Sequence, residues 1–277
     1  MKRQKKIALI NDMTGYGRCS LTVEIPIISA MNIQTCPLPT AVLSAHTGFP
    51  LYFLDDYTEN MAIYMDNWKA LNVQFDGICT GFLGSEKQIE LVERFFHLFK
   101  KEDTLTVVDP VMGDDGRIYA SYTEAMCQGM KRLLPYADVI TPNMTEACVL
   151  LDIPYEDSLQ FGETKWKEMA RQLCEKGPTK VVLTGIHQGD QVGNLVYEAS
   201  GSSQLLMSEK IGISRAGTGD VFTSVVAGSL VRGNELADAV RQAMEFICRA
   251  LRYTEQQGLE WNEGICFEPF LVSLSQD

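Results

Sequence analysis

The 277-residue chain has no surplus of basic residues. Its 24 Lys and Arg stand against 36 Asp and Glu, which gives a formal net charge of -12 at pH 7. A protein that binds nucleic acid needs cationic side chains to neutralise phosphates, so this balance argues against a nucleic-acid partner. A single nucleotide needs only a small site with a favourable local charge, so the net charge does not exclude a nucleotide-binding protein.

The chain also lacks a long apolar run. Its N-terminus, Met1–Lys6, is basic, but the apolar run after it, Ile7–Ile10, ends at Asn11-Asp12 and is too short for a signal peptide. No apolar stretch approaches the length of a membrane span. We therefore expect no membrane partner.

The eight cysteines are scattered, with no Cys-x-x-Cys pair and no metal-ligand spacing. Most lie in apolar contexts such as Gly77–Cys79, where a free cysteine packs as a small hydrophobic side chain. This usage favours a reducing compartment over a disulfide framework, and we predict a cytoplasmic protein.

Several familiar phosphate- and metal-binding motifs are missing. Gly15-x-Gly17 lacks the third glycine of a dinucleotide-binding fingerprint, and no Gly-x-x-x-x-Gly-Lys-Ser/Thr or His-Arg-Asp motif occurs. Asp114-Asp115-Gly116 lacks the spaced carboxylates of a calcium loop. The sequence therefore excludes a P-loop enzyme and offers no protein-kinase signature.

Short apolar strands alternate with helical segments along the chain. We expect a first strand at 7–10 with a helix ending near 31, further strands at 75–80, 104–108, 138–141 and 180–185, and further helices at 57–71, 86–101, 122–134, 163–175 and 235–257. Residues 194–197 and 205–207 predict a hairpin. The alternation predicts one α/β domain over residues 1–277, with a mostly parallel central sheet and helices on both faces.

Two local features add detail to this fold. Residues Thr35–Phe53 contain Pro37, Pro39 and Pro50, so we expect irregular strands that form a small β lid or edge ribbon outside the core. Ser85 fits the N-cap of the helix at 86–101, and Gln88, three residues later, predicts a capping box.

The stretch Gly217-Thr218-Gly219-Asp220 carries a chemical signal. Its glycines permit a tight turn, and the small and apolar residues that follow predict a buried helix. The free amides and positive end of such a helix suit a phosphate. A carboxylate there repels the anion unless it takes a proton from the attacking group, so Asp220 is either the base of a phosphoryl transfer or an ordinary cap.

Polar residues follow other strands at their carboxyl ends: Asp109, and Asn143 with Glu146. Because the carboxyl ends of parallel strands lie along one edge of a sheet, these residues could share a crevice with Asp220. Mg²⁺ that arrives with a nucleotide needs one or two carboxylates. Each residue alone could be a turn or cap, as could Asp12, but together they favour a nucleotide-dependent transfer.

The ordered motifs resemble those of the ribokinase-like superfamily and, within it, of the pyridoxal/pyridoxamine kinases. They are Tyr16-Gly17, His46-Thr47-Gly48-Phe49, Gly81–Ser85, Asp109–Gly113, Thr141-Pro142-Asn143-x-x-Glu146, and Gly217–Asp220 with Phe222. The resemblance implies phosphorylation of the 5′-hydroxymethyl group of pyridoxal, pyridoxamine or pyridoxine, with ATP and Mg²⁺, by a homodimer. It leaves open whether a monovalent cation is required.

The resemblance also implies roles for single residues. Asp220 matches the catalytic base, and the anion hole is formed by Gly217, Thr218 and Gly219. Groups that manage Mg²⁺ and phosphate, partly through water, are Asp109 and Glu146. The nucleotide side is matched by Thr141, Asn143 and Thr184. Positions that face the pyridine ring are Asp12, Thr47 and Phe82.

Two positions depart from the pyridoxal kinase pattern. Many of those enzymes have serine where this chain has Asp12, and often tyrosine where it has Phe82. Asn11–Gly15 leans toward hydroxymethylpyrimidine kinases, although those carry a cysteine-bearing motif in place of Gly217–Asp220. A hydroxymethylpyrimidine kinase, a sugar or nucleoside kinase of the superfamily, and a non-catalytic vitamer- or nucleotide-binding regulator remain as alternatives. An acid at position 12 could favour the cationic amine of pyridoxamine.

Overall fold

The computed structural model describes residues 3–275, which form two compact units. Unit 1 contains the described residues up to Gly81, Lys101–Leu105 and those from Ile211 onward. Unit 2 contains Phe82–Lys100 and Thr106–Lys210. The chain thus leaves unit 1 after the fourth strand, returns briefly at Lys101–Leu105, and returns again ahead of the Gly217–Asp220 turn.

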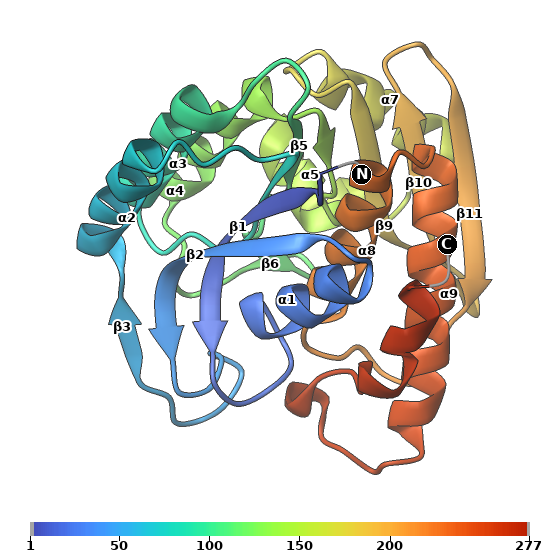
Figure 1. Cartoon of the computed structure of the whole chain (residues 1–277). Helices are drawn as coiled ribbons and strands as arrows, with labels where there is room; N and C mark the ends of the chain where they lie inside the picture. Colours follow the sequence, from blue (N-terminus) through green and yellow to red (C-terminus); the bar gives the residue numbers. More distant parts are fainter. Residues whose placement is uncertain (1–2, 276–277) are drawn as a thin grey trace. The chain divides into compact units, whose positions relative to one another are not determined.

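Unit 1 is built around β1 (Lys6–Thr14). This strand pairs in parallel with β2 (Gln34–Leu43) on one side and β4 (Gly77–Thr80) on the other, while β3 (Leu54–Asp56) runs antiparallel to β2 (Figure 1). The residues of Ile7–Ile10 are each at most 1% exposed. Their continuous apolar run is typical of a central parallel strand that is covered on both faces.

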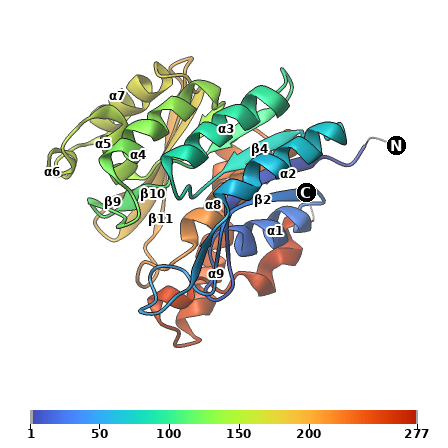
Figure 2. The same cartoon turned by 90° about the vertical axis from the view of Figure 1, so that its left-hand side faces the viewer.

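Helices lie on both faces of the unit 1 sheet. Figure 2 shows α1 (Leu21–Ala30) and α2 (Thr58–Ala70) on opposite sides of β2. Helix α8 (Thr218–Arg232) packs against α1 and against the long α9 (Leu236–Glu255). The C-terminal segment contains two short 3₁₀ helices, η2 (Trp261–Glu263) and η3 (Glu268–Leu274).

The prediction of irregular strands over Thr35–Phe53 is wrong for its first part. β2 is continuous through Pro37 and Pro39, which lie opposite Leu9 and Asn11 of β1. The amide of Gln34 donates to β1, and alternate residues of a strand point their amides to opposite sides. The prolines therefore fall where the amide points away from β1, so no ladder bond is lost. β3, the antiparallel edge strand, begins just after the predicted range.

Unit 2 also contains parallel strands. β5 (Leu105–Val108), β8 (Val139–Ile140) and β9 (Lys180–Gln188) are parallel neighbours. The predicted hairpin is confirmed as β10 (Gln191–Glu198) and β11 (Ser203–Glu209), which extend the sheet from β9 in antiparallel order. A separate two-stranded ribbon joins β6 (Gly113–Asp114) to β7 (Arg117–Ile118).

The helices of unit 2 follow one another along one side of its strands (Figure 2). They are α3 (Glu86–Phe99), α4 (Glu124–Met130), which continues into the 3₁₀ helix η1 (Lys131–Tyr136), α5 (Met144–Leu151), the short α6 (Tyr155–Ser158) and α7 (Glu163–Cys174). The bounds of α3, of α4 with η1, and of α7 agree closely with the helices predicted at 86–101, 122–134 and 163–175.

The predicted cap of α3 is half right. The hydroxyl oxygen of Ser85 accepts from the backbone of Gln88, as expected of an N-cap. The side chain of Gln88 does not complete the capping box, because its Oε1 accepts from the backbone of Gly84 at 2.7 Å. The glutamine therefore ties down the loop before the helix.

The predicted fold class is confirmed: α/β, with mostly parallel strands, flanking helices and a small antiparallel ribbon. The eight cysteines are all free thiols. Within residues 3–275, the model contains no helix with the length and apolar character needed to span a bilayer.

Candidate active site

Asp220 lies in the first turn of α8, three residues after the N-cap Gly217. Gly217 has φ 74°, and a Cβ there would lie 1.8 Å from the carbonyl oxygen of Arg18, so this position requires glycine. The amide of Val221 donates to the carbonyl of Gly217, which is the first turn of helical bonding. Amides ahead of it have no intrahelical acceptor, so the start of α8 presents N–H groups and a positive dipole end.

The carboxylate of Asp220 is half-buried and held by donors from β1 and from the start of α1. Asn11 Nδ2 lies 3.4 Å from its Oδ1, and the backbone N–H of Ser20 also donates to it. Burial raises the pKa of Asp220 to about 6, and the charge of Asp12 adds to the rise while the two donors oppose it. A carboxylate with a pKa near neutrality suits a general base.

Asp12 lies near enough to Asp220 in unit 1 for the two charges to interact. Its Oδ1 accepts from the Ser20 hydroxyl at 2.6 Å and its Oδ2 from the Thr14 hydroxyl at 2.7 Å. Burial raises the pKa of Asp12, against the effect of these hydroxyls. Asp12 and Asp220 thus form a pair of carboxylates with raised pKa values.

Ser20 links this pair. Its hydroxyl donates to Asp12 and its backbone N–H to Asp220, while its φ of 53° and ψ of -141° lie in a region that glycine favours. Such a backbone costs on the order of 1–3 kcal/mol and persists where neighbouring contacts require it. Here the two carboxylates supply those contacts.

Thr47 lies in the exposed loop after β2. Its neighbour His46 anchors this loop: Nδ1 accepts from the backbone of Gly48 at 3.1 Å, so Nε2 is the protonated nitrogen and donates to the carbonyl of Asn262 at 2.6 Å. Both ring nitrogens are therefore used in fixing the loop to the C-terminal segment of unit 1.

The predicted nucleotide-side residues gather in unit 2. Thr141 and Asn143 directly follow β8, and Asn143 forms a parallel bridge with Thr184 of β9. The amide of Thr184 donates to the carbonyl of Pro142 at 2.9 Å. The parallel register of β8 and β9 therefore brings these three residues together.

Glu146 is buried at the start of α5. Its Oε1 accepts from the backbone of Met112 at 3.1 Å and its Oε2 from the backbone of Asn143 at 2.9 Å. The Asn143 side chain accepts from the Glu146 amide in return, which completes a capping box. Burial, and next the charge of Asp109, raises the pKa of Glu146 well above its ordinary value.

The carboxylates of Asp109 and Glu146 are near enough to repel each other, and a cation would relieve that repulsion. Among the described residues, no group of three or more His, Cys, Asp or Glu side chains forms a metal-binding cluster. Both Glu146 oxygens already accept backbone N–H groups. This donor set fits Mg²⁺ that keeps several waters and arrives with phosphates, which is the water-mediated role predicted for the two residues.

Phe82 belongs to unit 2, whereas Asp12 and Thr47 belong to unit 1. Its ring packs at a steep angle against Tyr122, with the ring centroids 6.0 Å apart. The buried Tyr122 hydroxyl accepts from the backbone of Leu83 at 3.2 Å, and burial raises its pKa. Tyr122 thereby positions the Phe82 loop.

Sequence reasoning missed several polar residues of the unit 1 site: Asn11, Cys19, Ser20 and Glu24. Ser20 alone carried a usable signal, because a serine before an apolar helical run is typical of an N-cap. The Cys19 thiol is buried near Asp220 and Asp12, which raises its pKa and keeps it protonated. It is therefore no nucleophile at neutral pH.

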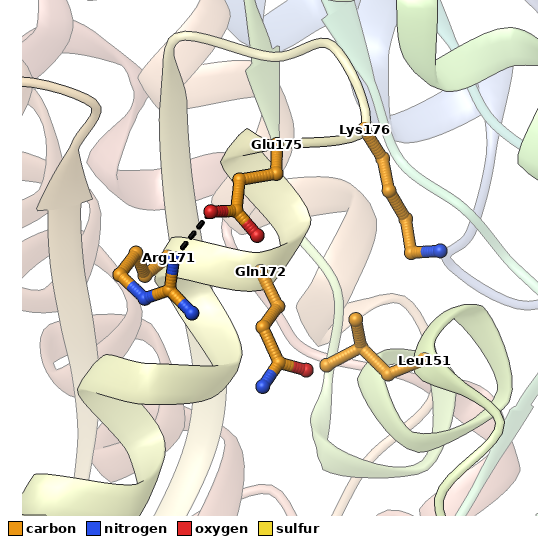
Figure 3. A pocket seen from close by; sticks show the side chains of 5 residues that line it. All are labelled: Leu151, Arg171, Gln172, Glu175 and Lys176. Atoms are coloured by element: carbon orange, nitrogen blue, oxygen red, sulfur yellow. Dashed lines mark hydrogen bonds and ion pairs between the residues drawn. The ribbon is translucent and has the colours of Figure 1, made fainter.

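A surface hollow of about 370 Å³ lies in unit 2, and none of the site residues described above lines it (Figure 3). Its lining residues are Leu151, Arg171, Gln172, Glu175 and Lys176. Arg171 and Glu175 form an ion pair across one turn of α7. Since these charged groups are exposed and mutually paired, the hollow is an ordinary solvated surface.

A model of the phosphomethylpyrimidine kinase family matches residues 65–265. The chain belongs to this family. It is 42% identical to a protein of Bacteroides thetaiotaomicron that is provisionally named a phosphomethylpyrimidine kinase, with a TM-score of 0.95 over 99% of this chain and 94% of the other. Another crystal form of that protein, described as containing pyridoxal, has a TM-score of 0.93 and covers 98% of this chain and 96% of the other, at 41% identity.

Two further relatives are named as B6 kinases. The pyridoxal kinase of Lactobacillus plantarum is 26% identical with a TM-score of 0.90, over 98% of this chain and 97% of that one. The pyridoxine/pyridoxal/pyridoxamine kinase of Bordetella avium is 27% identical over 265 residues, which are 90% of this chain and 85% of the relative. The chain is thus a phosphotransferase with an alcohol group as acceptor. The predicted resemblance to the pyridoxal kinases is confirmed.

Proposed function

We propose that the protein transfers the γ-phosphoryl group of ATP to the 5′-hydroxymethyl group of pyridoxal, pyridoxamine or pyridoxine, with Asp220 as general base. The observation that carries the proposal is the Asp220 carboxylate in the first turn of α8, where its pKa is raised to about 6. The names of the Lactobacillus and Bordetella relatives, and the pyridoxal in the Bacteroides crystal, support a B6 vitamer as acceptor.

In the proposed reaction, Asp220 accepts the proton of the acceptor hydroxyl as the oxygen attacks the γ-phosphorus. The bond from the γ-phosphorus to the bridging oxygen breaks and ADP leaves, while the proton remains on Asp220. The amides of Gly217, Thr218 and Gly219 stabilise the charge on the transferring group. The proposed contacts of the vitamer ring in unit 1 are Asp12 and Thr47.

The nucleotide is proposed to contact Thr141, Asn143 and Thr184, which β8 and β9 bring together. Asp109 and Glu146 would hold Mg²⁺ through water. The ion, when bound, neutralises phosphate charge.

A hydroxymethylpyrimidine kinase is the second candidate. The description of the matching family and the name of the Bacteroides relative favour it, and both substrates are hydroxymethyl-bearing aromatic rings. In this chain the alternative would use the same base and the same turn, although Gly217–Asp220 lacks the cysteine that hydroxymethylpyrimidine kinases carry there. The ring contacts alone would distinguish the two substrates.

We also propose that the protein works as a homodimer in the cytoplasm. The segment before β3 exposes large apolar side chains, with Leu51 86% and Phe53 67% exposed. A second copy would bury them, because such a patch is costly on a monomer. Sedimentation should give twice the mass of one chain, and a monomer at micromolar concentration would contradict the dimer.

One assay tests the proposed activity. ADP release is measured with Mg-ATP and, in separate reactions, pyridoxal, pyridoxamine, pyridoxine, hydroxymethylpyrimidine and ribose. We expect the largest kcat/KM with a B6 vitamer. A larger value with hydroxymethylpyrimidine or ribose would assign the alternative kinase, and vitamer binding without ADP release would identify a non-catalytic regulator.

A further inference from the structure

The side chain of Asn11, in the second half of β1, lies between two carboxylates. Asn11 is 1% exposed, and its Oδ1 accepts from the backbone N–H of Asp12 at 2.9 Å. Since only the amide oxygen can accept, this bond fixes the orientation of the amide group. Nδ2 therefore points the other way, 2.9 Å from Glu24 Oε1 and 3.4 Å from Asp220 Oδ1.

Glu24 anchors the Asn11 amide from α1. It is 3% exposed and lies in the first turn of that helix, where the positive end of the dipole favours a carboxylate. A hydrogen bond to an ionised acceptor is shorter and stronger than a neutral one. Nδ2 carries two hydrogens, so it can donate to Glu24 and to Asp220 at once.

Gly81, directly after β4, makes room for the amide. A Cβ at this position would lie 2.4 Å from Asn11 Nδ2 and 2.6 Å from its Cγ. Any side chain at residue 81 would therefore displace the Asn11 amide. Residues of β1, of α1 and directly after β4 together hold the side chain of Asn11 in place.

We infer that Asn11, held by Glu24 and given room by Gly81, is a positioning residue that fixes the carboxylate of Asp220 in one orientation. The inference rests on the proposed role of Asp220 as base. With donors from Asn11 and from the Ser20 backbone, the carboxylate still has a lone pair left to accept a substrate proton. Without Asn11, the carboxylate loses its side-chain restraint and can shift out of line, and a small misplacement of a catalytic group costs rate.

The inference has an electrostatic consequence. The charged or titratable groups that face Asp220 within unit 1 are Asp12 on β1, Cys19 ahead of α1, and Glu24 through Asn11. Asp12 raises the pKa of Asp220, while the Asn11 hydrogen bond lowers it. Loss of Asn11 should therefore raise that pKa and move the acid limb of the kcat–pH profile to higher pH.

The test compares Asn11→Ala, Glu24→Leu and Glu24→Gln in the full chain, with kcat, KM and the pH profile measured for each. We expect Asn11→Ala to lower kcat about 10- to 100-fold, with little change in the KM for ATP and an upward shift of the acid limb. Glu24→Leu should act in the same direction. Glu24→Gln should lose less, because its amide oxygen can still accept from Asn11.

Asn234→Ala is the matched control, since Asn234 bonds Ser229 at the far end of α8. Wild-type kcat in Asn11→Ala and Glu24→Leu would overturn the inference, as would a lower kcat with an unmoved acid limb, which marks a merely structural role. If Asn11→Ala does not fold, the same measurements on Asn11→Ser, Glu24→Leu and Glu24→Gln test the inference. Full turnover by Asp220→Asn would instead refute the proposed base, so the two failures are distinguishable.

Discussion

Each unit contains a pair of neighbouring carboxylates, and the two pairs are held in different ways. In unit 1, Asp12 accepts from two side-chain hydroxyls, and Asp220 accepts from a side-chain amide and a backbone N–H. In unit 2, both oxygens of Glu146 accept from backbone N–H groups, next to Asp109. Burial raises the pKa of a carboxyl in both pairs.

The difference indicates separate tasks. Glu146 satisfies two backbone amides, so its removal leaves buried donors without an acceptor, which costs stability. Asp220 can be changed to a neutral amide that still accepts from its neighbours. We therefore expect substitutions in the unit 1 pair to reduce turnover and substitutions of Glu146 to reduce stability.

The largest expected effect is that of Asp220→Asn on turnover. Loss of a general base costs about 10²- to 10⁴-fold in rate, so kcat should fall by that amount while the Kd for ATP stays close to the wild-type value. Single-turnover ADP formation and ATP binding measure the two quantities. Near-normal kcat would remove Asp220 from the reaction.

The same variant should be more stable at neutral pH. Asp220 has a folded-state pKa of about 6 against an ordinary 3.8, so ionisation above pH 6 costs folding free energy. Asp220→Asn removes that cost, and the free energy of unfolding should rise by roughly 1–3 kcal/mol at pH 7.5. The gain should shrink as pH falls from 6 toward 3.8. Urea titrations at pH 7.5 and 4.5 test this, and an equal gain at both would be inconsistent with it.

Gly217→Ala should have the next largest effect. Its Cβ would overlap the Arg18 carbonyl and its φ of 74° is unfavourable for alanine, so the start of α8 must shift. We expect kcat to fall about 10- to 100-fold, because the anion-hole amides move with the helix start. Gly162→Ala is the control, since a Cβ there meets nothing within 4 Å. Equal kcat in the two variants would show that the turn tolerates a side chain.

Glu146→Ala should lower turnover per molecule folded less than the unit 1 variants, because Glu146 would act on Mg²⁺ only through water, but it should clearly lower stability. The backbone N–H groups of Met112 and Asn143 lose their acceptors, so the free energy of unfolding should fall by about 1–3 kcal/mol. Glu163→Ala, an exposed glutamate at the start of α7, is the matched control and should change it little. Denaturant unfolding at pH 7.5 compares them. An unchanged stability with lost ATP binding would make Glu146 a ligand-binding group first.

Much of the fold followed from local patterns. β4 and β5 are short apolar runs stopped by polar or proline residues, and α3, α7 and α9 have strong helical periodicity, so each was predictable without tertiary information. The prediction of β1 is right for its apolar start at 7–10 but wrong for its end, because the strand continues through Asn11 and Asp12 to Thr14. β2 was not predictable in this way, because Pro37 and Pro39 indicate breaks in a strand when its partner is unknown. Only the pairing with β1 shows which amides the hydrogen-bond ladder uses.

The candidate site divides in the same way. The sequence by itself determined Asp220, its glycine turn and the strand-end residues Asp109, Asn143 and Glu146, since turn chemistry and strand ends are local properties. Tertiary structure alone decided that Asn11 lies against Asp220 and is held by Glu24, and that Ser20 joins Asp12 to Asp220. The contact of Asn11 with Asp220 links residues 209 positions apart. No periodicity or spacing encodes such a contact, because it depends on how β1, α1 and α8 pack.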